Sequence, residues 1–227
     1  MSIEEKSEPN LQRGMKYSFL LSISLVFSKV VRGLLVPKIL DPISYGLFSS
    51  IGLITRYIQF SDFGALASFI KEIPSKHFSS SGQERKNLID ETLSFLILAT
   101  VFTSLYLGLV AIFFEGDNEY FFKTSALILI PTFALKKFKD FIQALVYGTG
   151  QYKNNALIAA SNQWSGLICV VGGILIWGPL GGVMGLFLNE VLQLILVLRL
   201  VKESVRIKFS ARVIQPIKKY SNLFFVQ

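Results

Sequence analysis

The sequence predicts an all-α protein, a polytopic bundle of about six transmembrane helices with both termini in the cytoplasm. Composition is the first observation: 52% of the 227 residues are hydrophobic, 17% are charged and the mean hydropathy is +0.52. Ordinary soluble domains are less apolar than this. The second observation is a series of long apolar runs. A helix rising about 1.5 Å per residue needs about 20 such residues to cross a hydrocarbon core of about 30 Å.

Helix-breaking residues separate the predicted spans. Pro37 and the pair Asp41-Pro42 end the first run and set a tight hairpin, because proline lacks an N–H and disfavours helical geometry in the residue before it. The pair Gly178-Pro179 ends the fifth run for the same reason. The predicted spans are residues 17–36, 44–69, 88–114, 124–147, 156–177 and 181–198.

Basic residues flanking the spans predict the orientation, because cytoplasmic segments of membrane proteins carry the excess of Lys and Arg. Fifteen basic residues fall in the amino-terminal segment, the loops after the second and fourth spans, and the tail. The opposite segments hold only Lys38 and Lys123, beside an acidic loop with Glu115, Asp117 and Glu119. Both termini are therefore expected in the cytoplasm. The net charge of +8 then follows from membrane insertion and implies no nucleic-acid partner.

Three regions follow along the chain. Residues 1–16 form a cytoplasmic amino-terminal segment, 17–201 form the helical bundle, and 202–227 form a basic tail that ends in what resembles the start of a further span. In the tail, basic side chains alternate with apolar ones, a pattern typical of segments that lie on an anionic inner leaflet. We therefore expect an integral protein of the cell's inner, cytoplasmic membrane, with membrane lipids among its partners.

Several chemistries lack the residues they need. The single histidine, His77, and the single cysteine, Cys169, are far apart in sequence, so neither a zinc site nor a disulfide is expected. No nucleophile elbow, phosphate-cradling glycine loop or histidine-based dyad is present. The sequence therefore predicts no enzyme, no catalytic residue, no metal and no cofactor.

Nine charged residues lie away from the ends of the predicted spans, and each costs about 2.5–3.5 kcal/mol at the centre of a membrane helix. A water-filled cavity would remove this cost. A cationic cavity favours a phosphate ligand, because Arg binds phosphate in a bidentate fork and Lys adds a point charge. We predict six substrate-binding cations, Lys29, Arg32, Arg56, Lys136, Lys137 and Lys139, and three residues for ion coupling or counter-charge, Asp62, Asp140 and Glu190.

Structural roles are the alternatives for these residues. The lysines of segment 136–139 could snorkel to the cytoplasmic headgroups, with Asp140 paired to one of them. Lys29 and Arg32, a few residues before Pro37 at the outer end of their span, could equally snorkel to the outer headgroups. Arg56 and Asp62 could form an ion pair within the membrane. Glu190, in an otherwise apolar run, could be protonated or hydrogen-bonded to a neighbouring span.

One part of the chain resembles a known family. Residues 32–48 (RGLLVPKILDPISYGLF), followed by DFGAL at 62–66 and KEIP at 71–74, resemble the opening hairpin of polysaccharide and O-antigen flippases. YGTGQ at 147–151 resembles the turn after the fourth helix of these proteins. They belong to the multidrug/oligosaccharidyl-lipid/polysaccharide exporter superfamily. The resemblance covers packing and turn motifs, and no segment around the lysines of 136–139 matches a family motif.

The resemblance implies two similar helical halves around a central cavity that opens alternately to either side of the membrane. It implies flipping of polyprenyl-pyrophosphate-linked oligosaccharide to the outer leaflet for surface polysaccharide biosynthesis, such as the O-antigen of lipopolysaccharide. The chain would be the amino-terminal half, completed by a second half or a second copy. The alternatives are a multidrug or cation antiporter half, a non-transporting membrane assembly subunit, and a membrane enzyme acting on lipid-linked sugars.

Overall fold

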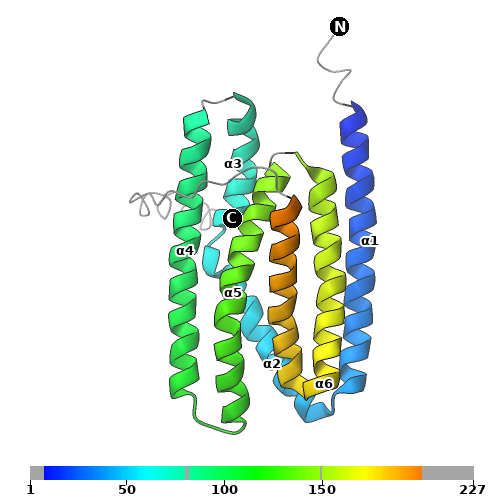
Figure 1. The fold of residues 1–227 in the computed structure, drawn as a ribbon, viewed down its shortest axis with the longest axis vertical. Coiled ribbons are helices and arrows are strands. Elements are labelled where there is room, and N and C mark those ends of the chain that lie inside the picture. The colour runs from blue at the N-terminus through cyan, green and yellow to red at the C-terminus, as the bar shows by residue number, and fades with distance from the viewer. Residues whose placement is uncertain (1–7, 80–81, 149, 201–227) are drawn as a thin grey trace.

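The computed structural model describes residues 8–79, 82–148 and 150–200, and these residues form helices joined by short turns (Figure 1). The predicted all-α class is confirmed for this described part of the chain. The predicted tail, 202–227, lies outside the described residues. In chain order the helices are α1 (Glu8–Ile39), α2 (Pro42–Gln59), the 3₁₀ helix η2 (Phe60–Asp62), α3 (Ala65–Ser79), α4 (Gly82–Phe113), α5 (Glu119–Gly148) and α6 (Tyr152–Leu200).

A tight turn joins α1 to α2, as the prolines predict. α1 continues through Pro37 before it ends, so Pro37 lies in its last turn. Asp41 then caps α2, because its Oδ2 accepts hydrogen bonds from the backbone N–H groups of Ile43 and Ser44, both at 3.1 Å. Pro42 is the first residue of α2, where its fixed φ suits a helix and an N–H is not needed.

The first helix is longer than the apolar run that predicts it. α1 begins at Glu8, before the predicted span starts at residue 17, so part of the predicted segment 1–16 is helical. Residues 11–16, LQRGMK, consist mostly of good helix formers. Hydropathy marks the apolar part of a helix, and polar residues with high helix propensity extend it.

The second predicted span, residues 44–69, is not one continuous helix. α2 ends at Gln59, η2 follows, and α3 begins at Ala65. Between them Phe63 has a φ of 45° and Gly64 a φ of 77°. Glycine adopts this left-handed conformation at no steric cost, whereas a phenylalanine there requires support from its surroundings. The prediction fails because hydropathy contains no information on these backbone angles.

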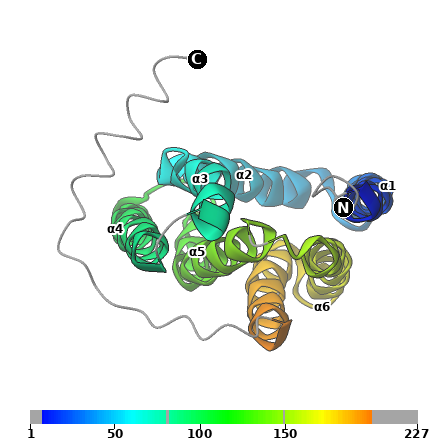
Figure 2. The ribbon, with the colours of Figure 1, turned by 90° about the horizontal axis from the view of Figure 1, so that it is seen from above.

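α6 is a helical hairpin. Trp177 (φ −131°, ψ 20°) and Gly178 (φ 61°, ψ −146°) leave helical geometry, and Pro179 follows, so the predicted break at this point is confirmed. We call residues 152–176 the first arm of α6 and residues 179–200 the second arm. The two arms run antiparallel and lie side by side (Figures 1 and 2). Each of the six predicted spans thus corresponds to helix in the described residues. The second span corresponds to α2, η2 and the start of α3, and the fifth and sixth spans correspond to the two arms of α6.

Glycines allow the two arms of α6 to touch through their backbones. A Cβ added at Gly181 would collide with the carbonyl of Gly173, and one added at Gly173 would collide with the carbonyl of Gly181. A Cβ at Gly185 would likewise collide with the carbonyl of Cys169. Close approach of this kind is typical of helix pairs in membranes, where small residues increase van der Waals contact.

α5 is the central helix. It packs against α4 on one side and against the arms of α6 on the other. Near the carboxyl end of α5 it also contacts α3, and α1 packs along α6. Seen from above, α1 and α4 lie at opposite ends of the bundle, and α2 and α3 cross one face (Figure 2). One buried cluster joins α2 to α5 and the α6 hairpin, and a second joins α3 to α4 and α5.

Two of the described helices, α4 (from Gln83 to Phe113) and α6, are long and apolar enough to cross a membrane. In their most apolar stretches only 28% and 33% of the residues are buried, unlike the core helix of a soluble protein. The outer face of α4 is instead covered with exposed large hydrophobic side chains, namely Val101, Phe102, Leu105, Leu109, Ile112 and Phe113.

Candidate charged site

The central helix α5 carries four of the nine predicted site residues. Lys137 and Lys139 are buried, with 6% and 1% of their surfaces exposed, whereas Lys136 and Asp140 are partly exposed. A helix turns once every 3.6 residues, so side chains two positions apart face different neighbours. Lys137 therefore contacts the end of α2 and η2, and Lys139 contacts α6.

Lys137 binds the carboxyl end of α2. Its Nζ donates a hydrogen bond of 3.0 Å to the carbonyl oxygen of Gln59, the last residue of α2, and lies 3.8 Å from Oδ1 of Asp62 in η2. The last carbonyls of a helix lack intrahelical partners and attract cations. Lys137 thus fixes the break between α2 and α3 to the centre of the bundle.

Lys139 forms the shortest buried ion pair of the described residues. Its Nζ lies 2.7 Å from Oε2 of Glu190 on the second arm of α6, and 3.6 Å from Oδ1 of Asp140. Glu190 is 7% exposed, so both ends of the pair are removed from solvent. A buried charge is tolerated only when it is paired and hydrogen-bonded. Glu190 therefore contacts a neighbouring helix as the partner in an ion pair.

These contacts define the α5 charge cluster, to which Lys136 belongs through its electrostatic interaction with Asp140 and Glu190. Its three lysines and three carboxylates give a formal charge of zero. Asp62 lies against a lysine and not against arginine, so the alternative of an Arg56–Asp62 pair is wrong. The cluster therefore presents no net positive charge to an anion. Its members are Lys136, Lys137, Lys139, Asp62, Asp140 and Glu190.

A polar network links the two arms of α6 beside the α5 charge cluster. Ser165 Oγ donates to Asn189 Oδ1 at 2.6 Å, and Asn189 Nδ2 donates to Asn162 Oδ1 at 3.0 Å. Gln193 Nε2 donates to Ser161 Oγ at 3.0 Å and to Ser165 Oγ at 2.8 Å. Such bonds satisfy polar groups that an apolar environment would penalise. Ser161 and Ser165 are not among the predicted site residues, although their spacing of four residues in an apolar run indicates a shared polar face.

The three remaining predicted cations, Lys29, Arg32 and Arg56, lie on α1 and α2, and we call them the α1–α2 cations. Lys29 and Arg56 are exposed, and Arg32 is half-buried. Arg32 shares a helix face with Ser28 and Val36, four residues before and after it, which are 2% and 3% exposed. None of the three cations forms an ion pair with another described residue. The six predicted cations thus fall into two groups and do not converge on one site.

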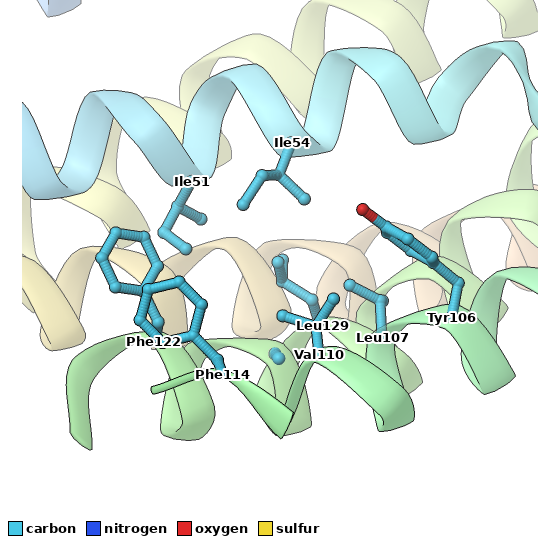
Figure 3. A pocket seen from close by; sticks show the side chains of 9 residues that line it. Ile51, Ile54, Tyr106, Leu107, Val110, Phe114, Phe122 and Leu129 are labelled. Carbon is cyan, nitrogen blue, oxygen red and sulfur yellow. The ribbon is translucent and has the colours of Figure 1, made fainter. Parts of the chain in front are cut away.

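A cavity of about 210 Å³ lies between α2, α4 and α5, on the side toward the α4–α5 turn (Figure 3). Its lining is apolar apart from the hydroxyl group of Tyr106, and it includes none of the nine predicted site residues. This cavity is therefore distinct from the water-filled cationic cavity that the sequence predicts.

No protein-family model, curated protein or solved structure matches this chain. The expected relationship to flippases thus rests only on the hairpin and turn residues quoted above.

Proposed function

We propose that the chain is one half of a membrane transporter that flips polyprenyl-pyrophosphate-linked oligosaccharide by alternating access, in the inner membrane of a cell that builds a surface polysaccharide. The second half of the transporter, or a second copy of this chain, completes the cavity. Both termini lie in the cytoplasm in this proposal.

The outer surface of the bundle supports a membrane location. Exposed apolar side chains cover α4, and others cover the arms of α6, including Ile168, Leu175, Ile176 and Leu192. Water would penalise these faces, whereas hydrocarbon solvates them. Charged and polar side chains instead gather between helices, in the α5 charge cluster and the α6 network, as is usual for ionisable groups within membranes.

The setting of Arg32 is the single observation that supports an anionic substrate. Arg32 is half-buried on the face of α1 that also carries buried Ser28 and Val36, and it has no carboxylate partner among the described residues. An arginine in this setting retains its full capacity for a bidentate contact with a phosphate. Lys29, one turn away on the same helix, supplies a second positive charge. A pyrophosphate group has the charge and geometry that these residues fit.

The direct test measures which leaflet holds the lipid-linked oligosaccharide. Cells lacking the protein should retain it on the cytoplasmic leaflet, where a membrane-impermeant oxidant labels it only in inside-out vesicles. Arg32→Gln should reproduce this retention, because an amide offers no positive charge. Arg32→Lys should restore part of the export, because it keeps the charge and loses the bidentate fork.

Lys38→Gln is the matched control, since Lys38 is an exposed cation in the last turn of the same helix. It should leave the distribution of the glycan unchanged. If deletion of the protein leaves the leaflet distribution unaltered, export is not its function.

A non-transporting membrane assembly subunit is the second candidate, favoured by the zero formal charge of the α5 charge cluster. In that case the buried ion pairs serve only to hold the helices together. The same assay separates the two functions, because loss of an assembly subunit would lower the total amount of lipid-linked glycan and not its share on each leaflet.

A further inference from the structure

The apolar cavity between α2 and α4 is a groove with a defined floor and walls. α5 forms the floor with Phe122, Ala126 and Leu129, while α2 and α4 form the walls (Figure 3). α2 and α4 make little direct contact here, so the groove is open along the face between them. The wall residues are Ile51 and Ile54 on α2, and Tyr106, Leu107, Val110 and Phe114 on α4.

The groove runs along the helices and matches one leaflet in length. From Tyr106 to Phe114 along α4 the rise is about 12 Å, at 1.5 Å per residue. One leaflet contributes about half of a hydrocarbon core of about 30 Å. The end of the groove at Phe114 adjoins the polar α4–α5 turn, where Glu115 and Asp117 place the chain in water or headgroups. The groove therefore extends from the membrane surface toward the midplane.

Hydrocarbon is the medium that reaches this groove. Exposed apolar side chains flank it on both walls: Leu53 and Tyr57 on α2, and Leu105 and Leu109 on α4. A buried water needs two to four polar partners, and the Tyr106 hydroxyl is the only polar side-chain group of the lining. Water does not fit such a groove, and an apolar chain does.

We propose that this groove binds one acyl chain of a bilayer phospholipid, drawn from the leaflet next to the α4–α5 turn. Its length favours a single acyl chain over the much longer polyprenyl chain of a sugar carrier. The proposal rests on membrane insertion and is independent of transport, so it survives if the protein exports nothing.

The experiment uses the full chain in lipid nanodiscs that contain phosphatidylcholine with a photoactivatable group near the end of one acyl chain. After illumination, labelled residues are mapped by mass spectrometry. We expect strong labelling at residues 106–110 and 126–129, above that of the fully exposed face of the first arm of α6 around Ile168 and Leu175. Equal labelling of the two regions would mean ordinary surrounding lipid and would overturn the proposal.

A groove-filling variant provides a second measurement. Ala126→Phe places a ring on the groove floor and should abolish the excess labelling, whereas Ala134→Phe, on the exposed face of the same helix, should leave it intact. If Ala126→Phe does not fold, the wild-type labelling pattern remains decisive. Displacement of the label by polyprenyl phosphate at concentrations where unlabelled phosphatidylcholine does not compete would also overturn the proposal.

Discussion

The α5 charge cluster and the α1–α2 cations both place basic side chains on apolar helices, but in opposite settings. In the cluster, carboxylates from η2, α5 and α6 lie close to the lysines, and the nearest pair is 2.7 Å apart. On α1 and α2 no described carboxylate reaches the three cations. A cation in an apolar helix therefore indicates a ligand site only where the protein itself does not neutralise it.

This difference decides what each region can do. Lys137 and Lys139 of the cluster already have carboxylate partners, so an anion would have to displace a carboxylate in order to bind to them. Their contacts join α5 to η2 and to the second arm of α6, which makes them structural. Arg32 is half-buried without a carboxylate partner among the described residues, so an anionic ligand would gain the whole of that interaction.

The largest expected effect comes from breaking the buried pair. Glu190→Gln leaves Lys139 charged and buried, and should lower the free energy of unfolding by about 3–5 kcal/mol. Denaturant unfolding in detergent, followed by circular dichroism, measures this. Glu119→Gln is the control, because Glu119 is exposed where it pairs with Lys123 at 2.6 Å, and surface pairs contribute at most about 1 kcal/mol.

The double variant Lys139→Met/Glu190→Leu separates charge from packing. Apolar side chains of similar volume should restore stability to within about 1 kcal/mol of the wild type, because replacing a buried ion pair is often neutral. A double variant as unstable as Glu190→Gln would show that the ion pair stabilises the fold by more than its two charges cost to bury.

The next largest effect pushes the two arms of α6 apart without changing any charge. Gly173→Ala inserts a methyl group against the backbone of Gly181. It should lower the free energy of unfolding by about 1–3 kcal/mol, because backbone atoms cannot move aside as a side chain can. The adjacent Gly172 has no atom within 4 Å of an added Cβ. Gly172→Ala should therefore be neutral or stabilising, and equal costs at the two glycines would argue against the close contact of the arms.

A smaller effect of different sign is expected at the α1–α2 cations. Arg32→Gln removes an unpaired, half-buried charge, so the free energy of unfolding should stay within about 1 kcal/mol of the wild type or rise. The same unfolding measurement tests this. If Arg32→Gln lowered the free energy of unfolding as much as Glu190→Gln does, Arg32 would have a structural partner, and the two regions would not differ as described.

The smallest effect is a pH dependence at the α1–α2 turn. Hydrogen bonds to the carboxylate from the Ser44 hydroxyl, and then from backbone N–H groups, hold the pKa of Asp41 below its ordinary value. The folded pKa is therefore below the unfolded one, and the stabilisation is present above the unfolded pKa and lost as pH falls through the folded pKa. Asp41→Asn keeps an acceptor for these bonds but does not titrate. The free energy of unfolding of this variant, measured by the same experiment across acidic pH, should therefore lack the loss that protonation of Asp41 causes in the wild type.

Local signals in the sequence predict much of the fold. Asp41-Pro42 and Gly178-Pro179 act through backbone geometry within a few residues, and both turns form where the sequence predicts them. The break at Phe63 and Gly64 escapes prediction, because the left-handed φ of Phe63 depends on surrounding structure. The polar start of α1 is not predicted either, because a hydropathy pattern contains no information on helix propensity.

The pairing of charges depends on tertiary structure and could not be predicted. Periodicity indicates which residues share a face of one helix, but it does not identify the helix opposite. Lys139 meets Glu190 only because α6 folds back on itself, and Lys137 meets Gln59 only because α2 stops there. The sequence thus identifies the charged residues of the candidate site, and the fold divides them into paired and unpaired groups.

Binding of farnesyl pyrophosphate to the purified protein in detergent, measured by titration calorimetry, tests this division most directly. Loss of charged hydrogen bonds worth about 1.5–3 kcal/mol should weaken binding by about 10- to 100-fold in Arg32→Gln. The Lys139→Met/Glu190→Leu variant should bind as the wild type does. The opposite pattern, with normal binding by Arg32→Gln and lost binding by the double variant, would contradict the assignment of the anion site to α1 and α2.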